Sequence, residues 1–198
     1  MISGNIVFCI FYKPFILIAA KENLRLQKII TLIAIVLFVT KIVAWYITGS
    51  LAILTDALES IVNIIAGLVG LYSLFLSAKP RDAAHPYGHG KVEFLSAAVE
   101  GTLISIAGIF IIYEAVLNFR QPSKITKLNV GMLLIGITAI INFYAGVICV
   151  RKGEKNKSLQ LVAGGRHLKS DTYSTAGIFA GLLLLYFTKL TWIDSAVA

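Results

Sequence analysis

The chain has 198 residues, of which 58% are hydrophobic and 14% are charged, and its mean hydropathy is +0.84. A soluble domain of this length needs a larger polar surface, so the composition excludes an ordinary soluble protein and indicates a membrane protein. The formal charge of +8 lies on short connectors rather than on one face. We therefore expect no nucleic-acid partner and a lipid bilayer around the chain.

Five apolar stretches reach the length of about 20 residues that a transmembrane helix needs. They cover residues 29–48, 51–77, 94–118, 129–150 and 160–188, and a further apolar stretch begins near Trp192. This pattern predicts an all-α, polytopic transmembrane helix bundle of five spans plus the start of a sixth, with residues 29–198 as one transmembrane domain. Residues 1–28 are apolar and then basic, and we expect this N-terminal segment in the cytoplasm or at the membrane interface.

The basic residues predict the orientation of the bundle. They precede the first span and crowd the second and fourth connectors, whereas the short connector after the first span has no charge. Because lysine and arginine are enriched in cytoplasmic connectors, we expect a cytoplasmic N-terminus in a multi-pass protein of the cell membrane. Arg120, Lys124 and Lys127 would lie on the opposite side, and they weaken this assignment without reversing it.

The second span has polar residues at a helical spacing. Asp56, Glu59, Ser60 and Asn63 follow at i, i+3, i+4 and i+7, which places all four on one face. Glu59 lies ten residues beyond Gly49 and is thus about 15 Å deep, close to the middle of the membrane. Ionisable side chains at this depth are costly and usually functional.

The fifth span repeats this arrangement with His167 and Asp171, four residues apart and at a similar depth. Two half-sites would supply four ligands to one ion. Oxygen and imidazole donors suit Zn²⁺, Mn²⁺ or Fe²⁺, and the lack of thiolates argues against copper(I). The alternative is that such groups only hydrogen-bond between helices, which is our first interpretation of Glu100, Glu114 and Asn142, although these three could also line the pathway.

The connector between the second and third spans contains two of the three histidines of the chain. Asp82, His85 and His89 could bind one ion, although a solvated loop is equally expected. The His-x-x-x-His spacing also occurs in membrane di-iron oxygenases, but those sites need many more histidines. The run Gly88-His-Gly-Lys91 lacks the spacing and the following Ser or Thr of a phosphate-binding P-loop.

These motifs resemble the cation diffusion facilitator family of metal/proton antiporters, and the resemblance runs from about Leu24 to the end. Its most specific parts are Gly49-Ser-Leu-Ala-Ile-Leu-Thr-Asp56-Ala, His85-Pro-Tyr-Gly-His-Gly-Lys-Val-Glu93 and His167-x-x-x-Asp171. The resemblance implies a six-helix bundle followed by a cytoplasmic ferredoxin-like domain, assembled as a homodimer. Since nearly all of a sixth span and that domain are missing, we expect a truncated sequence.

The resemblance also implies a ligand set. The family's transport site has His or Asp and a second Asp four apart on helix two, with His/Asp-x-x-x-Asp on helix five. These positions fall on Glu59, Asn63, His167 and Asp171 here. Helix five matches, but Asn63 offers a neutral carbonyl oxygen where a carboxylate is usual. Asp56 on the same face could compensate, as a ligand or as a charge beside the ligands.

Together these features predict a secondary active transporter, and not an enzyme, that exports Zn²⁺, Mn²⁺ or Fe²⁺ from the cytoplasm by proton antiport. We expect no resident cofactor. The family's loop site falls on Asp82, His85 and His89, which would concentrate metal at the cytoplasmic mouth. The alternative function is a membrane sensor or buffer that binds metal without transporting it.

Overall fold

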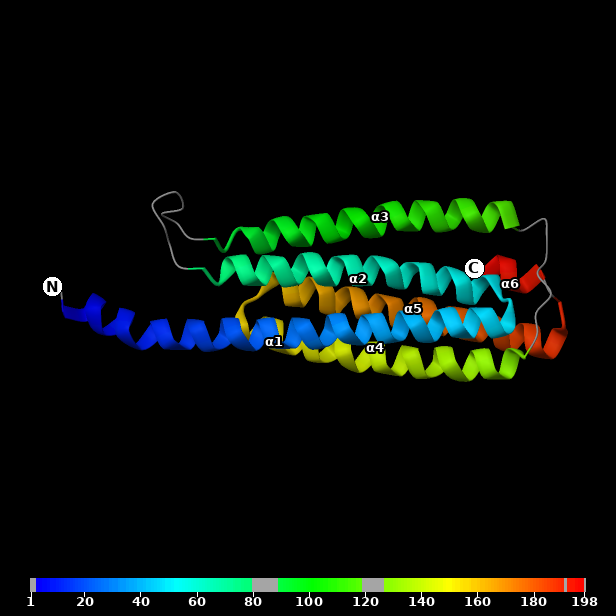
Figure 1. Ribbon diagram of the computed structural model, residues 1–198, viewed down its shortest axis with the longest axis horizontal. Coiled ribbons are helices and arrows are strands. Elements are labelled where there is room, and N and C mark those ends of the chain that lie inside the picture. The colour runs from blue at the N-terminus through cyan, green and yellow to red at the C-terminus, as the bar shows by residue number, and fades with distance from the viewer. Residues whose placement is uncertain (1–2, 80–88, 119–126, 191, 198) are drawn as a thin grey trace.

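The computed structural model describes residues 3–79, 89–118, 127–190 and 192–197. They form six helices and, within these ranges, no strand (Figure 1). The helices are α1 (Ser3–Thr48), α2 (Leu51–Ser77), α3 (Val92–Asn118), α4 (Leu128–Asn156), α5 (Leu159–Thr188) and α6 (Trp192–Val197). The predicted all-α helix bundle is confirmed.

The helix bounds lie close to the apolar stretches of the sequence, with one clear difference at α1. This helix has 46 residues and includes most of the expected N-terminal segment. Its length is about 69 Å at 1.5 Å per residue, whereas the apolar core of a bilayer is about 30 Å thick. The first part of α1 must therefore extend beyond the membrane core.

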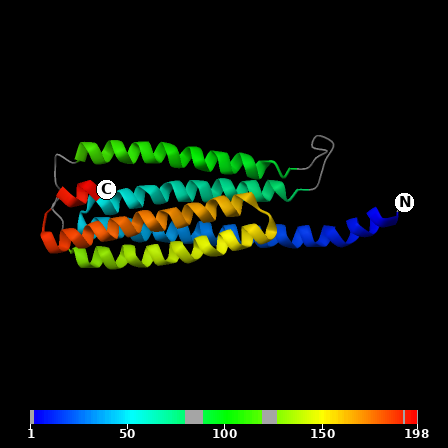
Figure 2. The same ribbon diagram turned by 180° about the vertical axis from the view of Figure 1, so that it is seen from behind.

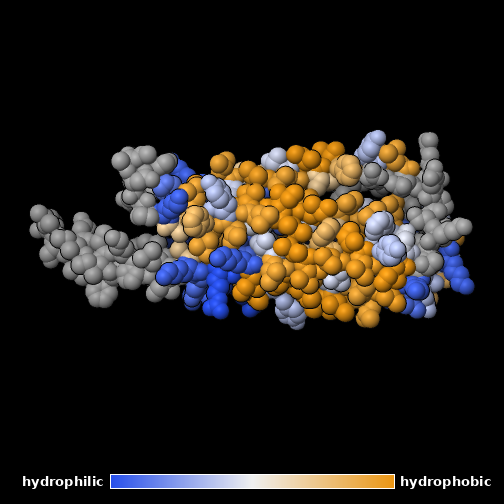
Figure 3. Space-filling view, viewed as in Figure 1, coloured by the Kyte–Doolittle hydropathy of each residue, from blue (hydrophilic) through white to orange (hydrophobic). Residues whose placement is uncertain are grey.

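Four helices among the described residues are long and apolar enough to cross a membrane. These segments are Ala19–Thr48, Leu51–Ser77, Val92–Phe110 and Leu128–Asn156. The 30-residue helix α5 is not among them, and its first half contains Arg166, His167, Lys169 and Asp171. On the face that Figure 3 shows, the surface between the two ends is mostly hydrophobic, as lipid contact requires. The chain is a multi-pass membrane protein.

Helix α5 lies at the centre of the bundle. It packs most extensively on α4 and also contacts α2, α3 and α6, while α1 packs on α2 and α4. Helix α3 lies at the edge of the bundle, against α2 and α5, as the two opposite views show (Figures 1 and 2). The central position of α5 places Gln160, Asp171 and Thr175 inside the bundle, whereas Arg166 is exposed.

Two glycines bring the backbones of α4 and α5 into direct contact. A Cβ atom on Gly165 would lie 2.8 Å from Cβ of Cys149, and one on Gly146 would lie 2.8 Å from the carbonyl oxygen of Gly165. Close approach through small residues is a common way for helices to associate in membranes. The contact fixes the height and rotation of α5 relative to α4.

The two ends of the bundle differ in charge. One end, called the basic end below, holds the α4–α5 turn and the end of α2, and its basic residues are Lys21, Arg25, Lys28, Lys79, Lys91, Arg151, Lys152, Lys155 and Lys157. The other, called the Gly49 end, holds the turn around Gly49 and α6. There Asp194 accepts hydrogen bonds from Ser50 Oγ at 2.5 Å and from the Leu51 N–H at 2.7 Å, so α6 satisfies free donors at the start of α2.

Candidate metal centre

His167 and Asp171 lie one turn apart on α5, and their side chains meet. His167 Nδ1 lies 3.3 Å from Asp171 Oδ1, and the Asp171 side chain is 2% exposed. From α2, Asn63 Nδ2 donates a hydrogen bond to Asp171 Oδ2 at 2.5 Å. The structure thus brings three of the four predicted transport-site residues together, across two helices that are far apart in the sequence.

Three atoms of this cluster are buried without a hydrogen-bond partner. They are Asn63 Oδ1, His167 Nε2 and Asp171 Oδ1. Buried polar atoms are almost always hydrogen-bonded, so an unpartnered set needs an explanation. An amide oxygen, an imidazole nitrogen and a carboxylate oxygen all offer lone pairs, and this donor set fits a divalent transition-metal ion as the cargo.

Glu59, the fourth predicted residue, lies one turn from Asn63 on α2 and is half-buried. It lies close enough to Asp171 and His167 for electrostatic interaction with both. Within the described ranges, no three His, Cys, Asp or Glu side chains are arranged closely enough to hold a metal ion. The four residues therefore lie near one another, but Glu59 does not complete a closed coordination sphere in this conformation.

Asp56 forms a buried ion pair that sequence reasoning did not find. Lys41 Nζ of α1 lies 2.9 Å from Asp56 Oδ1, and both side chains are at most 1% exposed. Thr175 of α5 donates a hydrogen bond to the same oxygen at 2.9 Å. The signal was present in the sequence, since a lysine in the middle of an apolar span rarely lacks a partner. The pair places Asp56 beside the cluster as a neutralised charge.

The predicted loop site is described only in part. Asp82 and His85 lie outside the described residues, and His89 is buried just before α3, where its carbonyl oxygen accepts from the Val92 N–H at 3.1 Å. His89 lines neither of the two cavities described next.

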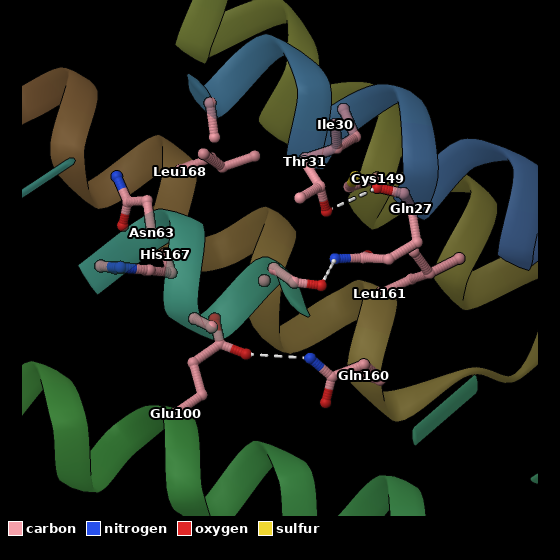
Figure 4. A pocket seen from close by; sticks show the side chains of 14 residues that line it. Gln27, Ile30, Thr31, Asn63, Glu100, Cys149, Gln160, Leu161, His167 and Leu168 are labelled. Carbon is pink, nitrogen blue, oxygen red and sulfur yellow. Dashed lines mark hydrogen bonds between the residues drawn. The ribbon is translucent and has the colours of Figure 1, made fainter. Parts of the chain in front are cut away.

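A first cavity lies between the cluster and the basic end, and we call it the basic-end cavity (Figure 4). Asn63 and His167 line it, together with residues of α1, α3 and α4 and the first turns of α5. Among the described residues that line it, Glu100 of α3 is the only one with a carboxylate. Sequence reasoning assigned Glu100 to interhelix contacts, and only the packing of α3 on α5 shows that it lines this cavity.

A second cavity, the Gly49-end cavity, lies on the other side of the cluster. It is lined by Asp56, Glu59, Ser174, Gly177 and Val197, among others. Among the residues that the structure describes, none lines both cavities. The cluster therefore separates a cavity toward the basic end from a cavity toward the Gly49 end.

Comparison with known proteins gives the family of this architecture. The family model of the cation efflux transmembrane domain matches residues 28–198. An uncharacterized transporter of Synechocystis, sll1263, is 34% identical over 158 residues, which are 80% of this chain and 51% of the relative. The metal cation efflux system protein CzcD of Cupriavidus metallidurans is 28% identical over 178 residues, 89% of this chain and 55% of the relative.

A third relative, the cation-efflux pump FieF of Pectobacterium carotovorum, is 31% identical over 173 residues, 85% of this chain and 56% of the relative. The chain thus spans about half the length of the curated relatives that it matches. The family match covers most of the chain and contains the whole cluster and, apart from Gln27, every described residue that lines its two cavities. The chain belongs to the cation efflux family, the cation diffusion facilitators.

Proposed function

We propose that this chain forms the membrane part of a secondary active transporter that exports a divalent transition-metal ion from the cytoplasm. The observation that supports the proposal most strongly is a set of three atoms that could bind metal, one each on Asn63, His167 and Asp171. They are buried between two cavities and have no hydrogen-bond partner. Two of the relatives are named for cation efflux. In this proposal Glu59 joins the three residues as the fourth ligand.

The ligand chemistry supports Zn²⁺, Mn²⁺ or Fe²⁺ as the cargo, because the donors are oxygen and imidazole nitrogen rather than thiolate. Metal ions bind the deprotonated forms of imidazole and carboxylate, so the arriving ion displaces protons from His167 and the carboxylates. Proton antiport follows, with protons returning to these groups when the ion leaves. No resident cofactor is needed for this cycle.

The two cavities support alternating access. We propose that the basic end faces the cytoplasm of the cell and that the protein lies in the cell membrane, since the basic residues gather at that end. The ion would enter through the basic-end cavity and leave through the Gly49-end cavity, as helices rock around the cluster. Asp82, His85 and His89 would gather metal at the cytoplasmic mouth, and two copies would form a homodimer.

The test is metal flux in proteoliposomes that contain the full-length protein and an indicator of internal Zn²⁺, Mn²⁺ or Fe²⁺. Asp171→Asn keeps the shape of the side chain but removes its charge, so we expect flux to fall at least about tenfold. Glu22→Gln is the matched control, because Glu22 is exposed and pairs with Lys152 away from the cluster.

Equal flux in the wild type and in Asp171→Asn would contradict the assignment of the site. Metal binding by the wild type without any flux, and without a change in internal pH, would show a sensor or buffer instead of a transporter. Flux of metal with an opposite change in pH, lost only in Asp171→Asn, is the expected result.

A further inference from the structure

Glu100 is a buried carboxylate that the transport cluster does not explain. Glu100 is 3% exposed, and among the described residues no lysine or arginine forms an ion pair with its carboxylate. Gln160 Nε2 donates a hydrogen bond to its Oε2 at 3.1 Å (Figure 4). A neutral amide offsets only part of the cost of burying a carboxylate, so a cation beside Glu100 would stabilise its ionised form.

The carboxylate is held in a fixed position. Ser96 forms a hydrogen bond with Oε1 of Gln160, which leaves the amide nitrogen of Gln160 to face Glu100. Oxygen Oε2 of Glu100 therefore accepts a hydrogen bond from α5, while Oε1 faces another residue of the same helix. A Cβ atom on Gly164 would lie 3.7 Å from this Oε1, so the oxygen faces α5 at a position without a side chain.

Glu100 and His167 share the basic-end cavity. Gly164 lies three residues before His167, on the same face of α5, so Oε1 of Glu100 faces α5 about one turn before the position of His167. The charge of Glu100 also interacts with His167. His167 Nε2 and Asn63 Oδ1 are buried without partners, and both residues line the cavity that Glu100 lines.

We propose that Glu100, His167 and Asn63 form a second position for the divalent cation, on the basic-end side of Asp171. The inference rests on the proposed function and adds a step to it. The ion first binds between the Glu100 carboxylate and His167, and then moves to Asp171 and Glu59. His167 serves both positions, because its Nδ1 stays beside Asp171 while its Nε2 is available for metal.

The atoms that line this second position determine which kind of ion it would bind. A carboxylate oxygen, an imidazole nitrogen and an amide oxygen select a divalent transition-metal ion over an alkali ion. Glu100 supplies the negative charge that Asn63 lacks.

Initial rates of Zn²⁺ and Mn²⁺ uptake into inverted membrane vesicles, which expose the cytoplasmic face, test the proposal. Glu100→Gln keeps an acceptor for Gln160 and removes only the charge. We expect its KM to rise roughly tenfold, with the maximal rate within about twofold of the wild type. Glu22→Gln removes a charge at the surface of the basic end and is expected to leave KM unchanged.

Glu100→Asp restores a carboxylate with a shorter side chain, and its KM is expected between those of the wild type and Glu100→Gln. If Glu100→Gln does not fold, the KM of Glu100→Asp tests the proposal in its place. The proposal would be overturned if the KM of Glu100→Gln lay within twofold of that of the wild type. It would also be overturned if Glu100→Gln lowered only the maximal rate, with KM unchanged, and Glu100→Asp did not restore that rate.

Asp171→Asn in the same vesicles separates the two proposals. Loss of flux in Asp171→Asn with an unchanged KM in Glu100→Gln would reject only the second position. Normal flux in Asp171→Asn would reject the proposed transport site itself, whatever Glu100→Gln does.

Discussion

At the residue scale, the charges around the cluster determine how well it fits a divalent ion. Asp56 was expected to compensate for the carboxylate that Asn63 lacks, but Lys41 Nζ lies 2.9 Å from Asp56 Oδ1 and cancels its charge. When ionised, Glu59 and Asp171 then contribute two negative charges, which match those of the cargo. Lys41 therefore sets the charge of the site without touching it.

Lys41→Met tests the importance of this pair for stability. The substitution leaves Asp56 buried and unpaired, and breaking a buried ion pair in this way costs about 3–5 kcal/mol. We expect a correspondingly lower free energy of unfolding, measured by titration with a denaturing detergent. Lys41→Met combined with Asp56→Leu removes both charges, and most of the lost stability should return.

Lys152→Met is the matched control. Lys152 also joins two helices, through an ion pair with Glu22 at 3.0 Å, but both side chains are more than 40% exposed. Exposed pairs contribute at most about 1 kcal/mol, so this variant should stay close to the wild type. Similar losses in Lys41→Met and Lys152→Met would show that burial does not strengthen the Lys41–Asp56 pair.

At the element scale, the contact between α4 and α5 positions half of the cluster. His167 lies two residues beyond Gly165, where the two backbones touch. Asp171 lies one turn further, so a shift of α5 along α4 would move both side chains away from Asn63. The glycines of this contact therefore act on the metal site through the position of a whole helix.

Gly165→Ala should destabilise the protein, because its Cβ would lie 2.8 Å from Cβ of Cys149 and from the Val150 nitrogen. Overpacking of this kind typically costs about 1–3 kcal/mol, and we expect a lower melting temperature with weaker metal binding. Gly177→Ala on the same helix is the control, since a Cβ there meets nothing within 4 Å in the described part of the chain. A melting temperature equal in both variants would contradict the close contact.

At the scale of the whole molecule, the fold was largely predictable and the cavities were not. Each helix follows an apolar run with polar breaks, and that signal is local in the sequence. A shared site on the second and fifth spans was also predicted, because depth and helical face follow from counting residues, and the family resemblance assigned Asn63 to it. The ion pair of Lys41 with Asp56, and the place of Glu100 in a cavity, depend on which helices are neighbours. No periodicity within one helix contains that information.

The arrangement of the whole molecule gives each cavity its own carboxylates. Glu100 lies in the basic-end cavity, whereas Asp56 and Glu59 line the Gly49-end cavity. The cluster between them belongs to α2 and α5. Helix α2 packs against α1, α3 and α5, and α5 packs against α2, α3 and α4, so together they contact every other long helix of the bundle. A cation at the cluster would thus stabilise the bundle at its centre.

The most direct test of the central claim is the visible absorption of Co²⁺ bound to the full-length protein in detergent. Co²⁺ stands in for the transported ion, and its absorption bands report nitrogen and oxygen ligands in a site of low coordination number. We predict one tight site whose bands disappear in His167→Ala and in Asp171→Asn and persist in Glu22→Gln. Bands that are unchanged in both of the first two variants would contradict the assignment of the metal to this cluster.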